Sequence, residues 1–224
     1  VADPRIIENP EVIDTITYRE LRELSYMGAS VLHEEAIFPV RKEGIPINIR
    51  NTNRPEDKGT MIVSKSATVS DTVITGVAGR KGFTAIFVEK DMMNLEVGFG
   101  KRVLQVLENH KIGFEHLPSG IDTMSIVVDS ESIKDLRPTI EAEIYKLVDA
   151  DKVEFYDDLA LIAVVGRGMV RTEGTACRVF SALANSHINI RMIDQGSSEL
   201  NIIIGIDDMN YKKALQAIYN EFVK

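Results

Sequence analysis

The chain has 224 residues, 44% of them hydrophobic, and a formal net charge of −8 at pH 7. This is the composition of a soluble globular protein with room for one large core or two small ones. The negative charge argues against nucleic acid or an anionic membrane as a partner. No apolar run approaches the ~18 residues that a membrane-spanning helix needs.

The beginning of the sequence and its cysteine content give two further expectations. The first five residues, from Val1 to Arg5, contain neither an initiator Met nor a signal-peptide pattern, so we expect a cut inside a longer chain. Cys177 is the lone cysteine of the sequence, which excludes an internal disulfide framework and fits the reducing cytoplasm.

Residues 1–65 predict a mixed α/β segment without a repeat of its own. Thr17, followed three residues later by Glu20, forms a capping-box pattern that predicts a helix over residues 17–27, ended by Gly28. The other predicted elements of this part are a helix over residues 32–43, strands over residues 45–50 and 60–64, and a polar linker over residues 64–71.

An internal repeat follows this segment. When the chain is shifted by 76 positions, the stretch 98–104 falls on the stretch 174–180, so that Gly98 meets Gly174. The shift predicts two copies of one supersecondary unit, each the size of a small domain. The register continues without a gap at four further pairs: Leu107 and Leu183, Ile112 and Ile188, Gly120 and Gly196, and Ile126 and Ile202.

Each copy has the order β-α-β-β-α, and a further strand follows. Apolar side chains at i, i+1 and i+4 predict a first helix with one buried face in both copies. The order is that of the ferredoxin-like split βαβ fold, one antiparallel sheet with two helices on one face, and the fold class is therefore α+β. Copy one has predicted strands at 84–89, 112–117, 121–128 and 152–156, and a second helix at 132–147. Copy two has predicted strands at 159–165, 188–193 and 200–206, and a second helix at 209–222.

The sequence also predicts the domain limits and the buried faces of the second helices. Copy two lacks a final strand before Lys224, and a strand at residues 73–77 could fill that place by pairing across the repeat. The predicted domains are residues 1–65, 66–157 and 158–224. The predicted buried stripes of the second helices are Leu136, Ile140, Ile144 and Leu147 in copy one, and Leu215, Ile218 and Phe222 in copy two.

The glycines that begin the first helix of each copy are candidate site residues. Backbone N–H groups at Gly98 and Gly174, together with the helix dipole, would suit a carboxylate or phosphate. A tight turn that needs glycine explains the same residues without a ligand. Glu115, whose repeat partner is Arg191, would offer a carboxylate for an ammonium group; the alternative is a solvated strand residue.

Other motifs assign no site. Gly166-Arg167-Gly168 begins like a dinucleotide fingerprint, but Arg171 occupies the third glycine position. The four histidines and Cys177 lack metal-ligand spacing, so we predict no metal. RNA binding, which a ferredoxin-like fold can support, needs aromatic stacking residues that the strand at 121–129 lacks.

Ordered motifs along the whole chain resemble those of aspartokinases. Residues 1–6 (V-A-D-P-R-I) are similar to the T-x-D-P-R-[IV] segment near the end of the catalytic domain, and residues 26–33 (Y-M-G-A-S-V-L-H) to its G-A-K-V-L-H region. Residues 45–52 and Gly59-Thr60 resemble its I-P-[IV]-x-[IV]-x-[NS]-[TS] strand and G-T turn. Residues 94–99 and 118–122 look like the first ACT domain of a lysine-sensitive type, and residues 165–169 and 189–193 look like the second.

The resemblance implies an enzyme that uses ATP, with Mg, to phosphorylate the β-carboxylate of L-aspartate on the route to Lys, Thr and Met. It places the main catalytic motifs before this stretch, so the stretch alone is expected to be inactive and to hold no catalytic residue. Arg5 matches an arginine that lies near the nucleotide. Ser30 stands where the family has a lysine that approaches the phosphates, and Glu34 replaces the proline after the histidine.

The resemblance also implies an effector amino acid between first ACT domains of two subunits, in a cytoplasmic homodimer or higher oligomer. L-lysine or L-threonine would bind there, and Glu115 favours lysine; the second ACT domain would mainly dimerise. Two alternatives stay open: a free-standing amino-acid sensor or partner-binding module with no kinase, and a structural dimer without a ligand. The positions that match the effector site are Met93, Gly98, Phe99, Gly100, Glu115, Ser119, Gly120, Ile121 and Asp122.

Overall fold

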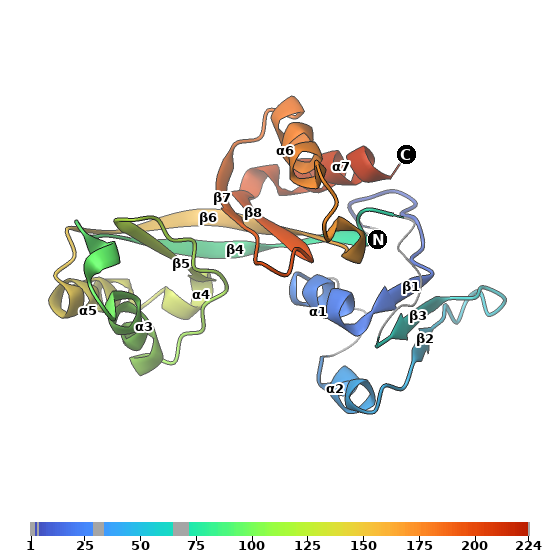
Figure 1. Ribbon diagram of the computed structural model, residues 1–224, viewed down its shortest axis with the longest axis horizontal. Coiled ribbons are helices and arrows are strands. Elements are labelled where there is room, and N and C mark those ends of the chain that lie inside the picture. The colour runs from blue at the N-terminus through green and yellow to red at the C-terminus, as the bar shows by residue number, and fades with distance from the viewer. Residues whose placement is uncertain (1–2, 4, 29–33, 65–71, 224) are drawn as a thin grey trace. The chain divides into compact units, whose positions relative to one another are not determined.

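The computed structural model describes residues 3, 5–28, 34–64 and 72–223, and it has the α+β class that the sequence predicts. The chain divides into two compact units, coloured along the chain in Figure 1. Unit 1 consists of Val1–Arg80 and Leu161–Lys224, and unit 2 consists of Lys81–Ala160. Ser30 and the linker residues 65–71 lie outside the described residues. No helix in the described ranges is long and apolar enough to cross a bilayer.

The first helix of unit 1 begins as its sequence predicts. Strand β1 (Thr15–Thr17) leads into α1 (Tyr18–Tyr26), and Thr17 is the N-cap. Thr17 Oγ1 accepts from the backbone N–H of Glu20 at 3.3 Å, and Glu20 Oε2 accepts from the backbone N–H of Thr17 at 2.9 Å. This reciprocal pair is the predicted capping box, which satisfies two N–H groups that a helix end otherwise leaves open.

A small sheet follows α1. Strands β2 (Ile47–Ile49) and β3 (Thr60–Val63) pair antiparallel, and β1 pairs parallel with β3, in the order β1-β3-β2. Both strands are shorter than the predicted segments 45–50 and 60–64. Helix α2 (Glu34–Lys42) covers most of the predicted helix 32–43, whose first two residues lie outside the described part.

Two long strands replace four predicted short ones. Strand β4 runs from Gly76 to Glu89 and β6 from Lys152 to Val165, 14 residues each, so the predicted pairs of separate strands are wrong. The middle of each strand is exposed, at residues 81–82 and 156–158. Polar residues there interrupt the apolar pattern, but the backbone continues. Each long strand therefore contributes five residues to unit 1 and nine residues to unit 2.

Unit 2 holds a three-stranded part of the large sheet in the order β5-β4-β6. Strand β5 (Thr123–Asp129) pairs antiparallel with β4. Helices α3 (Phe99–Asn109) and α5 (Arg137–Val148) lie against each other and share one core with these strands (Figure 1). Residues 112–117 were predicted as a strand and are not one: they make only isolated bridges, such as His116 to Val127.

The second helix of copy one is shorter than predicted and buries Val148 in place of Leu147. A four-residue helix, α4 (Ser130–Ile133), precedes α5, which has Pro138 in its first turn. Proline lacks a backbone N–H and is tolerated at the first turn, so it begins a new helix here. Ile140 and Ile144 are fully buried as predicted, but Leu147 is 43% exposed and Val148 is buried instead.

Unit 1 contains the second copy, with the sheet order β4-β6-β8-β7. Its elements are a 3-10 turn at Arg167–Met169, α6 (Thr175–Asn185), β7 (Ile190–Asp194), β8 (Asn201–Asp207), a 3-10 turn at Asp208–Asn210, and α7 (Tyr211–Phe222). Strands β7 and β8 pair antiparallel, and α6 packs against α7. Leu215 and Ile218 are buried as predicted, whereas Phe222 is half-buried beneath the Arg178 guanidinium, 4.1 Å from its ring centre.

The repeat is confirmed in its helices and needs a gap in its strands. Helices α3 and α6 have 11 residues each, and their N-caps, Gly98 and Gly174, are 76 positions apart. The strands β5 and β8 end at Asp129 and Asp207, which are 78 positions apart (207 − 129). The predicted gapless register is therefore wrong after Gly196, where copy two has two extra residues before its strand.

The most buried charged residue of the described chain is Glu20 in α1, at 0% exposure. Its two carboxylate oxygens accept five hydrogen bonds, from Thr17, Thr75 and Arg167. Burial is the largest influence on the pKa of Glu20 and raises it, but these hydrogen bonds together outweigh it. They hold the pKa below its ordinary value of 4.5.

This lowered pKa predicts an acid-sensitive contribution to stability. Because the folded pKa lies below the unfolded one, ionised Glu20 stabilises the fold at pH values above the unfolded pKa, and this stabilisation disappears as pH falls through the folded pKa. In urea unfolding between pH 7 and pH 3, Glu20→Gln should lose less stability on acidification than the original chain. Glu43→Gln, which removes an exposed carboxylate, should lose as much stability on acidification as the original chain. An equal acid loss in all three proteins would contradict the assignment.

Candidate functional site

The turn before α3 has the geometry that the sequence predicts for its glycine. Gly98 is the N-cap with φ of 82°, and Gly174 is the N-cap of α6 with φ of 80°. Glycine adopts this left-handed conformation without a steric penalty. Neither N-cap residue supplies a side-chain hydrogen bond to the helix. The first-turn amides of both helices must therefore find other partners.

One of the predicted carboxylate-binding amides is already engaged. The backbone N–H of Phe99 donates to the Glu96 carbonyl at 3.1 Å. The amides of Gly98 and Gly100 are the remaining candidates in this turn. The side chain of Phe99 is 3% exposed and belongs to the core of unit 2, so it anchors the helix start.

Two loops of the predicted site are joined to each other by hydrogen bonds. Asp122 Oδ1 accepts from the backbone N–H of Met92 at 3.0 Å, and the Asp122 carbonyl accepts from the N–H of Lys90 at 2.9 Å. Met93 follows in the same loop and packs against the core of unit 2. The structure thus brings the Met93 loop and the Asp122 turn together, and the Asp122 carboxylate fixes that contact.

The turn that contains Asp122 is closed by its own hydrogen bonds. The N–H of Gly120 donates to the Thr123 carbonyl at 2.7 Å, and Ser119 Oγ donates to the Leu117 carbonyl at 3.2 Å. A Cβ atom at Gly120 would lie 2.7 Å from Thr123 Oγ1, so a larger residue here would force the Thr123 side chain to move. Ile121 is 70% exposed at the tip of the turn.

Strand β5 relates the helix start to Glu115. A Cβ atom at Gly100 would lie 3.7 Å from Met124 Cε, so the first turn of α3 is next to Met124. The backbone N–H of Glu115 donates to the Val127 carbonyl at 2.8 Å, three residues farther along the same strand. At ~3.3 Å per residue, Met124 and Val127 are about 10 Å apart. One carboxylate oxygen of Glu115 is buried, and the residue has an interaction within the chain.

Sequence reasoning missed Arg102, a cation in the first turn of α3. Its Nη1 donates to the Val97 carbonyl at 3.2 Å, and its Nη2 forms an ion pair with Glu96. Arg102 therefore fastens the loop before α3 to the helix. The repeat contained a signal, because Arg178 occupies the equivalent position of copy two; there the guanidinium pairs with Glu221 at 2.9 Å.

Large apolar side chains of the same loops are exposed. Met92 is 64% exposed, Leu95 66% and Val97 95%, in addition to Ile121. Scattered exposed apolar residues are normal, but these four come from two loops that are hydrogen-bonded to each other.

Arg5, the predicted nucleotide-side residue, lies in unit 1 and pairs with its neighbour. Its Nε and Nη2 donate to the Asp3 carboxylate at 3.0 Å and 2.7 Å. The guanidinium is exposed, so this fork holds the local chain conformation and remains open to solvent. A role beside a nucleotide would require Arg5 to exchange or share this partner.

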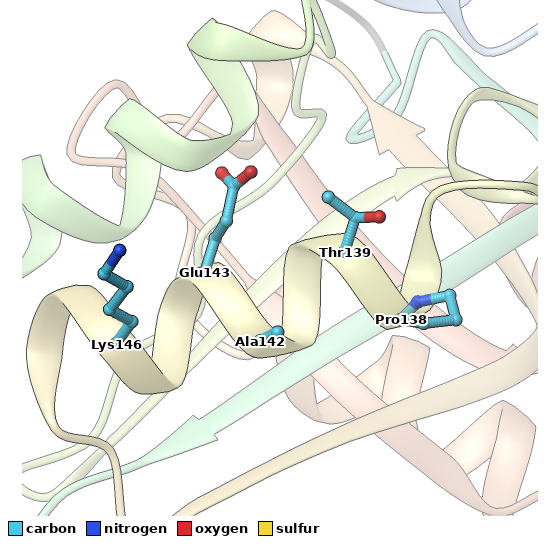
Figure 2. Close-up of a pocket in the computed structure, with 5 residues that line it drawn as sticks. All are labelled: Pro138, Thr139, Ala142, Glu143 and Lys146. Atoms are coloured by element: carbon cyan, nitrogen blue, oxygen red, sulfur yellow. The ribbon is translucent and has the colours of Figure 1, made fainter.

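A surface pocket of unit 2 is lined by none of the predicted site residues. Figure 2 shows its lining side chains, which all project from α5: Pro138, Thr139, Ala142, Glu143 and Lys146. Glu143 Oε1 lies 3.2 Å from His110 Nε2 at the end of α3. Within the described residues, no group of three or more His, Cys, Asp and Glu side chains could hold a metal ion.

Comparisons with known proteins agree with this arrangement. The Amino acid kinase family matches residues 1–51, and the ACT domain family matches residues 162–222. Aspartokinase 3 of Bacillus subtilis is 44% identical over 98% of this chain and 48% of its own length. The crystal structure of Clostridium acetobutylicum aspartate kinase is 51% identical, with a TM-score of 0.94 over 99% of this chain and 51% of that one.

A more distant structure shares the fold. E. coli aspartokinase III in complex with lysine and aspartate has a TM-score of 0.78 over 100% of this chain and 49% of that one, at 24% identity. Together with the ACT domain match, these neighbours confirm the predicted tandem ferredoxin-like fold. The chain spans about half the length of the relatives it matches. It belongs to the aspartokinase family, and it corresponds to a stretch that joins an amino acid kinase segment to ACT-type repeats.

Proposed function

We propose that this chain is the effector-binding regulatory region of an aspartate kinase, and that L-lysine is its effector. The parent enzyme would transfer a phosphoryl group from ATP, with Mg²⁺, to the β-carboxylate of L-aspartate. Feedback by the effector would control the pathway to lysine, threonine and methionine. The 44% identity to Aspartokinase 3 over nearly the whole chain supports the family activity.

The observation that carries the effector assignment is the pair of polar ends beside β5. The Gly98 and Gly100 amides, at the positive end of the α3 dipole, would donate hydrogen bonds to the α-carboxylate. Glu115, bonded to a strand position about 10 Å farther on, would receive a cationic group. Two separated charges of opposite sign fit a diamino acid better than threonine. The related E. coli enzyme was crystallised with lysine.

The exposed apolar loops support a second copy as the partner. Met92, Leu95, Val97 and Ile121 would be covered if first ACT domains of two subunits met at these loops. An effector held between them would be shielded from water, which strengthens its charged contacts. The turn that contains Ser119, Gly120 and Asp122, which is closed by its own hydrogen bonds, would form one wall of this site.

Calorimetry tests the effector. L-lysine, L-threonine, L-methionine and diaminopimelate are titrated separately into the chain, and we expect a saturable heat with lysine. A kinase assay tests the region's place in the enzyme: this chain alone should form no aspartyl phosphate. Heat from none of the four amino acids would favour a structural dimer without a ligand. A chain that is expressed in its organism without a kinase domain would favour a free-standing sensor.

Replacing Glu115 by alanine should weaken lysine binding at least ~30-fold, because removing one partner of a buried charged pair costs about 2 kcal/mol or more. Glu131→Ala is the matched control: this carboxylate is 81% exposed in the same unit, and its loss should leave the affinity unchanged. Circular dichroism verifies that both variants fold. Equal lysine affinity in the two variants would remove Glu115 from the site.

A further inference from the structure

The buried carboxylate of Glu20 joins segments that match two different families. Glu20 lies in the stretch that matches the amino acid kinase family, and Arg167 in the stretch that matches the ACT domain. Glu20 Oε1 accepts from the backbone N–H of Arg167 at 3.0 Å, and Glu20 Oε2 accepts from Arg167 Nη1 at 2.9 Å. Oε1 also accepts from Thr75 Oγ1 at 2.5 Å. We call Thr17, Glu20, Thr75 and Arg167 the Glu20 junction.

The Gly166-Arg167-Gly168 motif gives the junction its fixed backbone. A Cβ atom at Gly166 would lie 2.6 Å from Ile74 Cα, and one at Gly168 would lie 2.2 Å from the Thr72 carbonyl oxygen. The two glycines therefore allow this loop to touch the backbone of residues 72–75. With the loop so placed, the Arg167 N–H and guanidinium both reach Glu20. The motif that fails as a dinucleotide fingerprint thus serves close packing.

The junction stands at one end of the two long strands. Thr75 immediately precedes β4, and Arg167 follows the last residue of β6 by two positions. Lys90 immediately follows β4, and Asp151 immediately precedes β6. At that end, Asp151 Oδ2 accepts from the N–H of Asp91 at 2.6 Å, in the loop that leads to Met93. Both strands therefore connect the candidate effector loops to the Glu20 junction through continuous backbone.

We propose that Glu20 is a positioning residue that couples the ACT-type repeats to the kinase-type segment, because it converts a shift of Thr75 and Arg167 into a shift of α1. This proposal rests on the effector function proposed above. A shift of the loop at residues 90–93 would be passed along the backbone of β4 and β6. At the other ends of these strands lie Thr75 and Arg167, which donate hydrogen bonds to Glu20. The coupling free energy cannot exceed the difference in contacts between the effector-bound and effector-free states. In this proposal, that difference is concentrated in the five hydrogen bonds that the Glu20 carboxylate accepts.

Glu20→Gln tests the coupling role of the Glu20 carboxylate. Glu20→Gln keeps the size of the side chain but replaces one accepting oxygen by an NH₂ group, which cannot accept from Arg167, Thr17 or Thr75. Binding of the effector, which takes place at residues of unit 2, does not involve Glu20. A merely structural role of Glu20 would change stability and leave the response of α1 to the effector in place.

Hydrogen exchange of the full chain, with and without saturating L-lysine, tests the coupling. In the original chain, lysine should change the exchange rates of amides in α1 and in residues 166–169 by ~5-fold or more, the effect of about 1 kcal/mol on local opening. In Glu20→Gln the same lysine affinity should persist by calorimetry, while the response of α1 falls below ~2-fold. Glu43→Gln, the same chemical change at an exposed carboxylate of the kinase-type segment, should respond like the original.

Each outcome decides something. If lysine binds the original chain but α1 does not respond, the coupling proposal is wrong and the effector proposal stands. If no heat of lysine binding is found, both are wrong. If α1 of Glu20→Gln responds as in the original, Glu20 has no coupling role. If Glu20→Gln does not fold, Thr75→Val, which removes a single donor, must reduce the α1 response by half or more; a full response overturns the proposal.

Discussion

Replacing Ile144 by alanine should lower the free energy of unfolding of unit 2 by about 3–4 kcal/mol. Ile144 is fully buried in α5 and packs in one cluster with Ile86, Val103 and Ile126. Removal of its side chain leaves a cavity that the surrounding β-branched residues cannot easily fill, because their side-chain rotamers are restricted. Urea unfolding followed by circular dichroism, together with hydrogen exchange of the α5 amides, measures the loss.

The control for this change lies one turn along the same helix. Leu147 is 43% exposed, so Leu147→Ala should cost less than about 1 kcal/mol. Both variants remove branched carbons from α5, and both keep good helix propensity. A loss at Leu147 as large as that at Ile144 would mean that α5 presents a different face to the core.

Gly168→Ala should destabilise unit 1 by about 3 kcal/mol. The added Cβ would lie 2.2 Å from the carbonyl oxygen of Thr72 and 3.0 Å from Val73 Cα, both backbone atoms that cannot turn aside as a side chain would. Overpacking of this kind forces a shift of the chain itself. The same urea experiment, with amide exchange of β8 as the reporter of unit 1, gives the size of the effect.

Gly196 supplies the matched control for this glycine. A Cβ there would meet no atom within 4 Å, and its backbone is not in the left-handed region. Gly196→Ala should therefore change the stability by less than about 0.5 kcal/mol, or raise it slightly through the unfolded chain. If both alanines were tolerated equally, the close packing of the Gly166–Gly168 loop would be refuted.

Local signals determined the helices well. Thr17 and Glu20 are three residues apart, and their reciprocal bonds need no distant partner, so the capping box could be predicted. The 76-residue repeat placed both glycine N-caps correctly for the same reason. The face of α5 was harder, because residues 147 and 148 both fit a stripe with Ile140 and Ile144. Tertiary packing chose Val148.

Strands were less predictable because their limits depend on neighbours. The polar residues in the middle of β4 and β6 looked like loops, yet both strands continue through them. Conversely, residues 112–117 have the composition of a strand but pair with β5 only at isolated positions. The role of Glu20 beyond its cap was also invisible, since Arg167 is 147 residues away in sequence.

The candidate effector site divides in the same way. The glycine turn at Gly98 could be inferred from the repeat, and its conformation agrees with that inference. That the Phe99 amide is engaged by Glu96 could not, because the loop between Met93 and Gly98 has no repeating pattern. Arg102 was overlooked because a cation in the first turn of a helix opposes the dipole and usually indicates a solvated residue.

The passage of β4 and β6 through both units has a consequence for the order in which the protein is made. Unit 2 is complete once Ala160 has been synthesised, whereas unit 1 needs Leu161–Lys224 to join a first part that ends at Arg80. Domains fold as units during synthesis. Residues 1–80 therefore lack the other part of their unit until residues 161–224 have been synthesised. A released chain that ends at residue 160 should protect unit 2 from protease and leave residues 1–80 sensitive.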